Sequence, residues 1–555
     1  MLRAVDLLRQ GRNQELWDMC CGWLSFSTEQ FMAVQNRLLL EQIELLRHSQ
    51  IGKKVLNSAS VKNVDDFRRR VPLTTYADYI PELSEKREDA LPVKPAFWVH
   101  SSGRSGEYPC KWIPITPRFA DEMSTVMYGI GILSGCDGWG DVSHLMENPR
   151  IVYTVAPRPY MSGAMASMLG LQSPVDYLPG LEESESLSFE DRIKLGFKMA
   201  LSEGLDYFFG LSLVLVTVGN KFSQSTQKVD LRPFLRQPKA LLRLAKGVLK
   251  SKLTGRHMLP RDLWSVKGIL CGGLDSWVYK EKIKELWGRY PLDVYAGTEG
   301  GIYAAQTWDY EGMTFVPSLN FLEFIPEKEH FKWQLDRTYQ PQTILLDEVK
   351  AGENYEVVLT NFHGGAMMRY RPGDMVRITS RRNEKLGIEI PQMVFERRAD
   401  GLIDFVFIRL TEKSIWQAIE SSGLEYEDWT AYKKPGEPVL SLYIELKNGD
   451  YTTKDEVGRA IYEQVMKADN ETKDTQYLIR DDFADMINFK IEVKLLPKGA
   501  FANYMAQRQA EGADLAHLKP PHINPSQKVL SLLLGKPEAI PAVKTAVERE
   551  PVTVP

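Results

Sequence analysis

The stretch Leu292-Asp293-Val294-Tyr295-Ala296-Gly297-Thr298-Glu299-Gly300-Gly301 decides how this chain folds. Its first residues have the apolar character of a buried strand, and its last residues form a glycine-rich turn. At such a turn the Tyr295 ring can stack on a planar base, and the Thr298 hydroxyl can meet a phosphate. The Glu299 carboxylate is the hard oxygen ligand that Mg²⁺ prefers. Taken alone, the stretch is equally compatible with an ordinary turn that carries a solvated glutamate.

The chain before this stretch mixes helices with strands. Ser27-Thr28-Glu29-Gln30 has the pattern of a capping box and predicts a helix start. Apolar runs that end at Gly, Ser or Pro predict buried strands at residues 96–99, 150–155, 265–270 and 292–295. Strands interleaved with helices indicate an α/β domain, in which ligands bind where strands end and loops begin.

The pattern of expected helices and strands changes near Arg398. A hairpin-like pair, a helix, a strand, a second helix and a second strand are expected at residues 402–410, 411–421, 439–447, 453–467 and 488–495. We therefore expect an α/β protein with a large N-terminal domain of mixed sheets and helices over residues 1–397. A small α+β domain is expected over 398–530, followed by a proline-containing flexible tail over 531–555.

Composition argues against several classes of function. The 555 residues are 43% hydrophobic and 26% charged, which is typical of a globular protein with an ample core. The net charge of −4 gives no reason to expect nucleic-acid binding, and the 5 cysteines and 8 histidines lack metal-ligand spacing. The N-terminus lacks a secretory pattern, and the longest apolar run, Phe208–Val218, is too short to span a bilayer. We expect a soluble, cytoplasmic protein.

One local exception is the basic stretch between Lys228 and Arg256, in which leucines run among many lysines and arginines and a single acid, Asp230. A basic amphipathic helix there would suit a membrane surface. The alternative is a solvated helix face on a large domain, and this is the interpretation that we adopt.

A second motif, Ser101-Ser102-Gly103-Arg104-Ser105-Gly106, follows the strand Phe97–Val99 and precedes Lys111. Small residues at this place let backbone N–H groups and hydroxyls close on phosphate oxygens. The spacing of a Walker loop is absent. The motif is also compatible with a common Gly/Ser turn.

Two further motifs follow. Tyr370-Arg371-Pro372-Gly373-Asp374 places an aspartate after a Pro-Gly turn, where it can accept both hydroxyls of a ribose or simply belong to the turn. Arg397-Arg398-Ala399-Asp400-Gly401-Leu402-Ile403 lies where the pattern of expected elements changes and suits a hinge, or a plain linker between domains.

Together and in this order, the four motifs resemble those of the adenylate-forming superfamily of acyl-CoA synthetases, peptide-synthetase adenylation domains and luciferases. One branch is particularly similar, the plant auxin-responsive acyl-acid amido synthetases and their bacterial relatives. Its patterns Ser-Ser-Gly-Thr-Ser, Tyr-x-x-Ser-Glu and Tyr-Arg-x-Gly-Asp match residues 101–105, 295–299 and 370–374. Supporting stretches lie at residues 67–76, 352–358, 499–501 and 518–521, so the resemblance covers the chain from Phe67 to Ile523.

The resemblance implies ATP and Mg²⁺ and assigns most of a site. The residues expected to bind ATP are Ser101, Ser102, Gly103, Arg104, Ser105, Tyr295, Thr298 and Asp374. Tyr295 would stack on adenine, Asp374 would hold the ribose and Glu299 would hold Mg²⁺. Where the family has threonine this chain has Arg104, which either binds phosphate bidentately or signals altered nucleotide handling or lost activity.

The catalytic residues implied by the resemblance are Lys519, Arg398 and Glu299, with Lys498 as the alternative lysine. Arg398 would contact ribose or phosphate, and Asp400 sits at the family's hinge position on a mobile small domain. For the acyl pocket, Gly272 and Gly273 match a position that borders adenine and acyl group, and Arg158 is available to a polar substituent. His100 and His363 lie beside motifs and are interpreted as structural.

The function that the resemblance implies is activation of a carboxylic acid as its acyl-adenylate, followed by transfer to an amine, with an amino acid as the expected acceptor. One alternative is an acid–CoA ligase that forms a thioester. The other is a degenerate member that binds nucleotide or acyl ligand without catalysis. The arguments for it are Arg104 and the spacing from Gly106 to Lys111, which is longer than the family's usual G-x-x-K. The sequence does not indicate which acid is used.

Overall fold

The computed structural model describes residues 2–56, 61–101, 110–224, 237–272, 276–399, 403–405, 408–447, 453–470, 489–510 and 520–535. The chain divides into two compact units. Among the described residues, the first unit lies within 2–399, and the second lies within 403–470 and 489–535.

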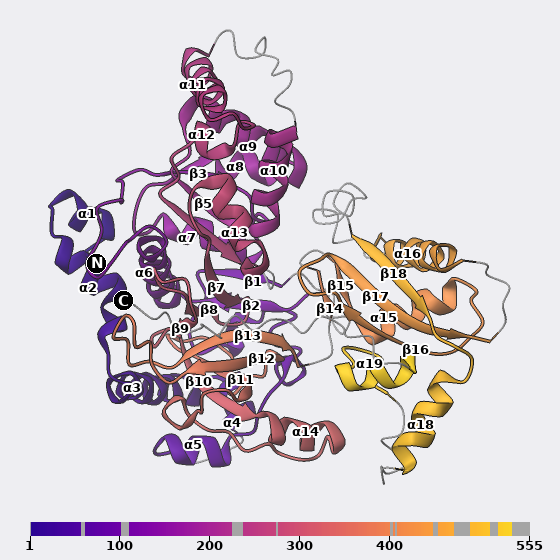
Figure 1. Ribbon diagram of the computed structural model, residues 1–555. Coiled ribbons are helices and arrows are strands. Elements are labelled where there is room, and N and C mark those ends of the chain that lie inside the picture. Colours follow the sequence, from indigo (N-terminus) through magenta and orange to yellow (C-terminus); the bar gives the residue numbers. More distant parts are fainter. Residues whose placement is uncertain are drawn as a thin grey trace, which may run out of the picture. The chain divides into compact units, whose positions relative to one another are not determined.

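An eleven-stranded mixed sheet organises the described part of the first unit (Figure 1). Its strands, in spatial order, are β10 (Asn320–Pro326), β11 (Asn354–Asn361), β12 (Asp374–Ser380), β13 (Gln392–Arg398), β9 (Met313–Phe315), β8 (Gly301–Ala305), β7 (Leu292–Gly297), β6 (Gly268–Gly272), β5 (Tyr207–Leu211), β3 (Arg150–Tyr153) and β4 (Asp176–Leu178). The β4-to-β7 half is parallel, and the β7-to-β10 half is antiparallel. The change of direction falls at β7, the strand that leads into the Thr298–Gly300 turn.

Helices pack against both halves of this sheet. They are α1 (Ala4–Arg9), α2 (Asn13–Cys21), α3 (Thr28–Arg47), α4 (Gln50–Leu56), α5 (Val64–Arg70), α6 (Pro117–Leu133), α7 (Met161–Leu169), α8 (Leu181–Ser186), α9 (Phe189–Glu203), α10 (Ser212–Gln224), α11 (Pro238–Thr254), α12 (Pro260–Leu263), α13 (Ser276–Trp287) and α14 (Glu327–Leu335). The helix α3 packs on β10, α6 on β6 and β8, and α9 on β3 and β4. The predicted capping box is confirmed, because Ser27 Oγ accepts from the Gln30 amide and the Gln30 side chain accepts from the Ser27 amide.

The predicted strands at residues 150–155, 265–270 and 292–295 are confirmed as β3, β6 and β7. The strand predicted at 96–99 exists as β1 (Phe97–His100), but the prediction that it is buried is wrong, since Val99 is its single buried residue. It pairs with β2 (Trp112–Ile115) in a separate two-stranded sheet, and its Phe97 and Trp98 side chains are partly buried against the core.

The longest apolar run is split between β5 and the start of α10. None of the helices in the described part of the chain has both the length and the apolar character needed to cross a membrane.

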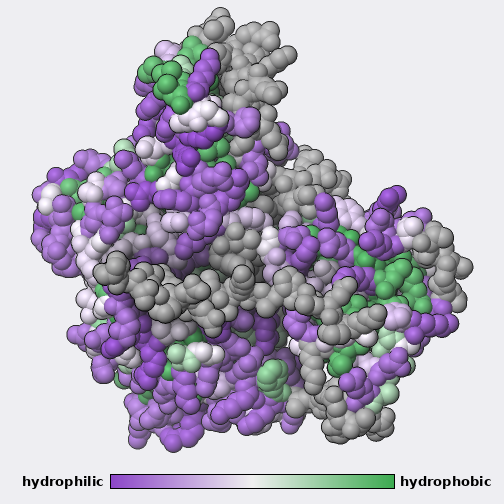
Figure 2. Space-filling model, in the orientation of Figure 1, coloured by the Kyte–Doolittle hydropathy of each residue, from purple (hydrophilic) through white to green (hydrophobic). Residues whose placement is uncertain are grey.

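The basic stretch contains the predicted helix, α11. It buries Ala240, Leu244 and Gly247 and leaves Leu242, Leu249 and Leu253 more than half exposed. Figure 2 shows apolar surface over this helix at the top of the view. The exposed leucines leave both interpretations of the stretch open.

The second unit contains the small α+β arrangement expected from the sequence. Its elements are β14 (Ile403–Asp404), β15 (Arg409–Leu410), α15 (Glu412–Ser421), β16 (Tyr426–Lys433), β17 (Val439–Leu446), α16 (Lys454–Asn470), β18 (Lys490–Leu495), α18 (Ala500–Ala510) and α19 (Gln527–Leu534). The strands β16, β17 and β18 form one sheet, antiparallel on one side of β17 and parallel on the other. The sequence did not reveal β16.

Two boundaries differ from those expected. Arg397 and Arg398 are strand residues of the large sheet, since β13 pairs with β12 as far as Asp374↔Arg398, so the two units divide after Asp400. The last described helix, α19, runs four residues beyond residue 530, because Leu530 and Leu533 are buried in an apolar cluster with α18.

Candidate active site

The turn between β7 and β8 carries Thr298 and Glu299. Two amides hold its backbone: Asn361 Nδ2 donates to the Glu299 carbonyl at 2.9 Å, and Asn320 Nδ2 donates to the Gly300 carbonyl at 2.7 Å. These asparagines are the last residue of β11 and the first of β10. The turn at the end of the parallel half is therefore fixed by the far edge of the antiparallel half.

The Glu299 carboxylate lies in a cluster with Lys111 and Tyr370. Lys111 Nζ is 3.4 Å from Glu299 Oε1 and 3.0 Å from Tyr370 Oη, and Tyr370 Oη donates to Glu299 Oε1 at 3.2 Å. Burial, followed by the charge of Glu299, raises the pKa of Tyr370 well above its usual range. The tyrosine therefore stays a neutral donor beside a carboxylate and an ammonium group.

A second cluster joins Tyr295, Asp374 and Arg398. Tyr295 Oη donates to one oxygen of Asp374 at 2.9 Å, and Arg398 Nη1 donates to the other at 2.5 Å. Burial raises the pKa of Asp374, whereas the Arg398 charge and the Tyr295 hydrogen bond act in the opposite direction. Because Asp374 and Arg398 are register partners of β12 and β13, this ion pair is built into the sheet.

The Tyr295 ring is buried, with Tyr303 at 4.8 Å and Phe395 at 6.0 Å between ring centroids. The structure gives this side chain a contact with Asp374 that the sequence did not suggest. Its stacking on adenine stays a prediction.

The Ser/Gly motif is the connection of the β1–β2 hairpin. At its base the Ser101 amide donates to the Lys111 carbonyl and the Lys111 amide donates to Ser101 Oγ, both at 3.1 Å. This closure puts Lys111 at the foot of the loop and near Glu299. The remaining loop residues assigned to phosphate, Ser102, Gly103, Arg104 and Ser105, lie outside the described residues.

The acyl-pocket assignments are more scattered. Gly272 ends β6, opposite Leu211 of β5. Arg158 is half-exposed and pairs with Glu185 Oε1 at 3.2 Å. Gly273, Asp400 and Lys519 lie outside the described residues. His100 contacts the Ser101 carbonyl, and His363 contacts that of Ser318, as expected of structural histidines.

In the second unit, His522, three residues after Lys519, has several contacts with its surroundings. His522 contacts Glu412 and Asp428, each at 2.7 Å, and stacks on Trp429 with a centroid distance of 4.6 Å. Its backbone carbonyl accepts from the Ala431 amide of β16. Burial alone would lower the pKa of His522, but the two carboxylates outweigh it and the pKa is raised. The alternative lysine, Lys498, is exposed in the turn before α18.

Three residues of these clusters were not assigned from the sequence: Lys111, Tyr370 and Asn361. The sequence did offer a signal for Lys111, since the related loops contain a lysine shortly after their glycine. The longer spacing from Gly106 to Lys111 in this chain obscured that signal. Tyr370 had a signal as the first residue of its motif. Asn361 had none, because its contact with the Glu299 carbonyl joins residues 62 positions apart.

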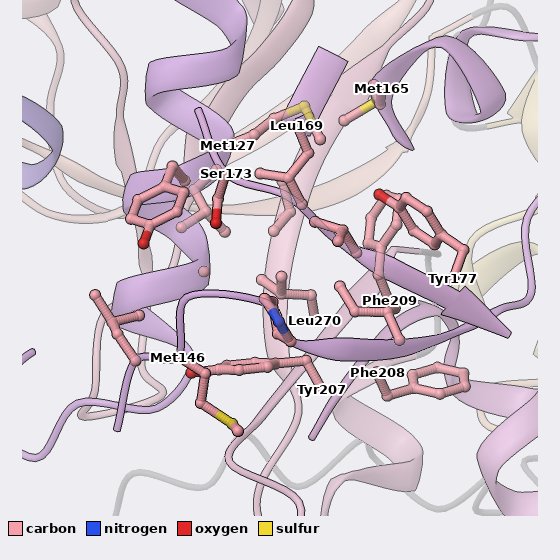
Figure 3. Close-up of a pocket in the computed structure, with 18 of the residues that line it drawn as sticks. Met127, Met146, Met165, Leu169, Ser173, Tyr177, Tyr207, Phe208, Phe209 and Leu270 are labelled. Atoms are coloured by element: carbon pink, nitrogen blue, oxygen red, sulfur yellow. The ribbon is translucent and has the colours of Figure 1, made fainter. Parts of the chain in front are cut away.

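A cavity of about 830 Å³, its opening included, lies between α6, α7 and the sheet. In Figure 3, Met165 and Leu169 of α7 and Tyr207 of β5 lie on different sides of it, with Leu270 of β6 between them. The lining reaches from Tyr207, the first residue of β5, to Ile302 near the Thr298–Gly300 turn. Arg158 is not among the lining residues.

The fold is similar to that of a solved acid–CoA ligase. A crystal structure of 2-hydroxyisobutyryl-CoA ligase in complex with 2-HIB-AMP and CoA superimposes with a TM-score of 0.51 at 15% identity. The superposition covers 85% of this chain and 87% of that one.

Two segments of the chain match models of the GH3 family. Residues 20–137 match the GH3 family N-terminal domain, and residues 313–398 match the GH3 family central domain. The resemblance read from the motifs is confirmed, and the second match spans Tyr370–Asp374 and Arg398.

Curated relatives of the chain are named as ligases and synthetases. The 4-substituted benzoates-glutamate ligase GH3.12 of Arabidopsis thaliana is 29% identical over 40% of this chain and 38% of its own length. The jasmonoyl–L-amino acid synthetase JAR4 of Nicotiana attenuata is 32% identical over 30% of this chain and 29% of its own. The aligned part of this chain thus spans about a third of each relative.

Proposed function

We propose that this chain uses ATP to activate a carboxylic acid as its acyl-adenylate and transfers the acyl group to an amine, with an amino acid as the acceptor. The observation that carries this proposal is the pair of clusters around Glu299 and Asp374. Four chain segments, near residues 111, 295–299, 370–374 and 398, converge on them. Both matched relatives are named for joining an acid to an amino acid.

The Asp374 cluster suits a ribose. Each carboxylate oxygen accepts one bond from the protein, from Tyr295 or Arg398, and retains a second lone pair for a hydroxyl. Because Arg398 and Tyr295 fix the carboxylate from two sides, it would be oriented before the nucleotide binds.

The Glu299 cluster suits phosphate and its counter-ion. Lys111 supplies a positive charge at the foot of the loop whose residues 102–105 we assign to the phosphates. The fit for Mg²⁺ is one hard carboxylate, Glu299, with phosphate oxygens and water as the other ligands, as is usual for this ion. Bound there, the ion would neutralise charge on the transferring phosphate.

In the first half-reaction a carboxylate oxygen of the acid bonds to the α-phosphorus of ATP, the bond to the β-phosphate oxygen breaks, and pyrophosphate leaves. In the second, the amine nitrogen bonds to the acyl carbon, AMP leaves, and the amine proton passes to solvent. We assign Lys519 to the meeting of the two anions in the first step, with Arg398 at the ribose or phosphate. We place Asp400 at a hinge that would exchange the two steps.

ATP use fits a reducing compartment such as the cytoplasm, which the five free cysteines also support.

The test is acid-dependent ATP–pyrophosphate exchange with Mg²⁺ across aryl, indole-type and aliphatic acids, followed by addition of amino acids, other amines or CoA. Exchange with any acid and amide formation with an amine are the expected results. If a thioester forms with CoA instead, the acyl acceptor in the proposal becomes CoA rather than an amine. If no acid in the panel supports exchange while ATP still raises the melting temperature, the protein binds nucleotide without this activity.

The lysine assignment has its own pair of variants. Lys519→Ala should abolish exchange while sparing transfer from a supplied acyl-adenylate, and Lys498→Ala should leave both steps near wild type. Equal loss of both steps in Lys519→Ala would refute the assignment.

A further inference from the structure

The cavity between α6, α7 and the sheet is uncharged. Among the described residues, no Asp, Glu, Lys, Arg or His lines it. Three of the hydroxyl groups in its lining already donate hydrogen bonds to backbone carbonyls: Tyr207 to His144, Tyr177 to Ala166 and Ser173 to Glu147. The fourth, Tyr128 Oη, is buried without a hydrogen-bond partner in the described part of the chain. Such a lining accepts an apolar group and rejects a second charge.

The cavity begins beside the candidate active site. Ile302, which lines it, follows Gly301, the residue that ends the Thr298–Gly300 turn. Gly301 has φ +71°, and a Cβ on it would lie 3.0 Å from Met123 Sδ of α6. One helical turn further along the same face of α6 is Met127, the first lining residue on that helix. The glycine that closes the catalytic turn therefore faces the helix that lines the cavity.

Two elements give the distance from the Thr298–Gly300 turn into the cavity. Along α6, the eight steps from Met123, which faces Gly301, to the lining residue Gly131 correspond to about 12 Å at ~1.5 Å per residue. Along β7, the lining residue Val294 lies three residues before Gly297 at the turn, which corresponds to about 10 Å at ~3.3 Å per residue. An extended alkyl chain with C–C bonds of about 1.5 Å needs roughly eight carbons to cover such a distance.

We propose that this cavity receives the tail of the acid, so that the substrate is a carboxylic acid with an uncharged apolar tail of about eight carbons or more. The inference rests on the proposed function, since the turn next to the cavity is where the carboxylate would react. A benzoate-sized acid held at the turn would leave most of the cavity unfilled. Each methylene buried there is worth about 0.8 kcal/mol, or roughly four-fold in affinity.

The first test is a series of straight-chain acids from butanoate to tetradecanoate, with benzoate as the short aryl comparison. The kcat/KM for exchange should rise about four-fold per methylene over several carbons and then level off as the cavity fills. Equal use of short and long acids, or a preference for benzoate, would overturn the inference and leave the proposed function intact.

The second test fills the cavity. Gly131 lines it, and a Cβ there meets no atom within 4 Å, so Gly131→Leu places a side chain in open space without a clash. Gly131→Ala is the matched control, because it gives the helix the same relief from glycine without filling the cavity. Gly131→Leu should lower kcat/KM for dodecanoate at least ten-fold and leave butanoate within two-fold. Gly131→Ala should lower kcat/KM for dodecanoate far less than Gly131→Leu does.

A binding measurement separates this inference from the activity. Dodecanoate should displace a fluorescent fatty-acid probe from the wild type and from Gly131→Ala without ATP, and Gly131→Leu should fail to bind the probe. This pattern without exchange for any acid would support the cavity assignment and refute the proposed activity. Exchange without displacement, or displacement unchanged in Gly131→Leu, would refute the cavity assignment.

Discussion

Replacing Arg371 with methionine is expected to lower the free energy of unfolding of the first unit by about 3 kcal/mol. Arg371 donates to both oxygens of Glu356, from Nε at 2.8 Å and from Nη2 at 2.7 Å, and its guanidinium stacks on Trp333 at 3.8 Å. His330 Nδ1 is 2.6 Å from the same carboxylate. All of these polar groups are buried, and Asp374 follows Arg371 by three residues. The network therefore anchors the motif that carries the ribose candidate.

The magnitude follows from what the substitution leaves behind. Removing one partner of a buried ion pair costs about 3–5 kcal/mol, because the other charge stays buried. Here His330 remains in contact with Glu356, and methionine keeps the apolar packing on Trp333, so we expect the lower end of that range. Burial alone would raise the pKa of Glu356, but His330 and Arg371 outweigh it and the pKa is lowered. The stabilisation is present above the unfolded pKa of about 4.3 and is lost as the pH falls.

The assay is urea unfolding followed by circular dichroism at neutral pH and at about pH 3, below the unfolded pKa, with the denaturant slope as a check on the unfolded state. Adding Glu356→Gln to Arg371→Met removes the stranded charge and should recover at least about 1 kcal/mol. The control is Arg377→Met on β12, the strand that follows Arg371. Its partner Glu396 is exposed and 3.2 Å away, so the substitution should cost less than about 0.5 kcal/mol. A cost below about 1 kcal/mol for Arg371→Met, or a double variant no better than the single, would refute the reasoning.

Three further predictions concern single side chains. Tyr128→Phe removes a buried hydroxyl that has no hydrogen-bond partner among the described residues, and it should leave the free energy of unfolding unchanged or raise it by up to about 1 kcal/mol in urea titration; a loss of stability would reveal a partner. Because the pKa of His522 is raised, its ion pairs stabilise the fold fully below the unfolded pKa of about 6.5 and progressively less as the pH rises through the folded value. The difference in melting temperature between wild type and His522→Gln should therefore narrow from pH 6 to pH 9. A constant difference would contradict the ion pairs. Arg398→Met should weaken ATP binding about ten-fold or more by calorimetry while Arg397→Met should not, and equal effects would refute the assignment.

What the sequence predicted well was local. The capping box at Ser27 depends on residues three positions apart, and the helix expected over 411–421 exists as α15, capped by Thr411. Strands β3, β6 and β7 combine short apolar runs with a following turn, so each carries its signal within ten residues. The motifs at Tyr295–Glu299 and Tyr370–Asp374 were recognisable for the same reason.

What the sequence did not reveal depends on contacts between distant segments. The hydrogen bond from Tyr295 to Asp374 joins residues 79 positions apart, and the Lys111–Glu299 contact spans 188. Nothing in either local pattern specifies that the tyrosine hydroxyl faces the aspartate. The cavity was equally invisible, because its lining combines α6, α7 and strands that become neighbours only in the folded sheet.

Strand register determines which of the two neighbouring arginines, Arg397 or Arg398, contacts Asp374, because residue type alone does not distinguish them. Successive side chains of a strand point to opposite faces, so neighbours of identical chemistry receive different surroundings. In the observed register Arg398 pairs across from Asp374 and donates to it, while Arg397 donates to Glu327 of α14 at 2.9 Å. A slip of one residue between β12 and β13 would turn Arg398 away from Asp374. The register shift between Met375 and Val376 confines the pairing at this end of the strand to Asp374 and its neighbour. The position of the guanidinium at the candidate ribose site is therefore a property of strand register.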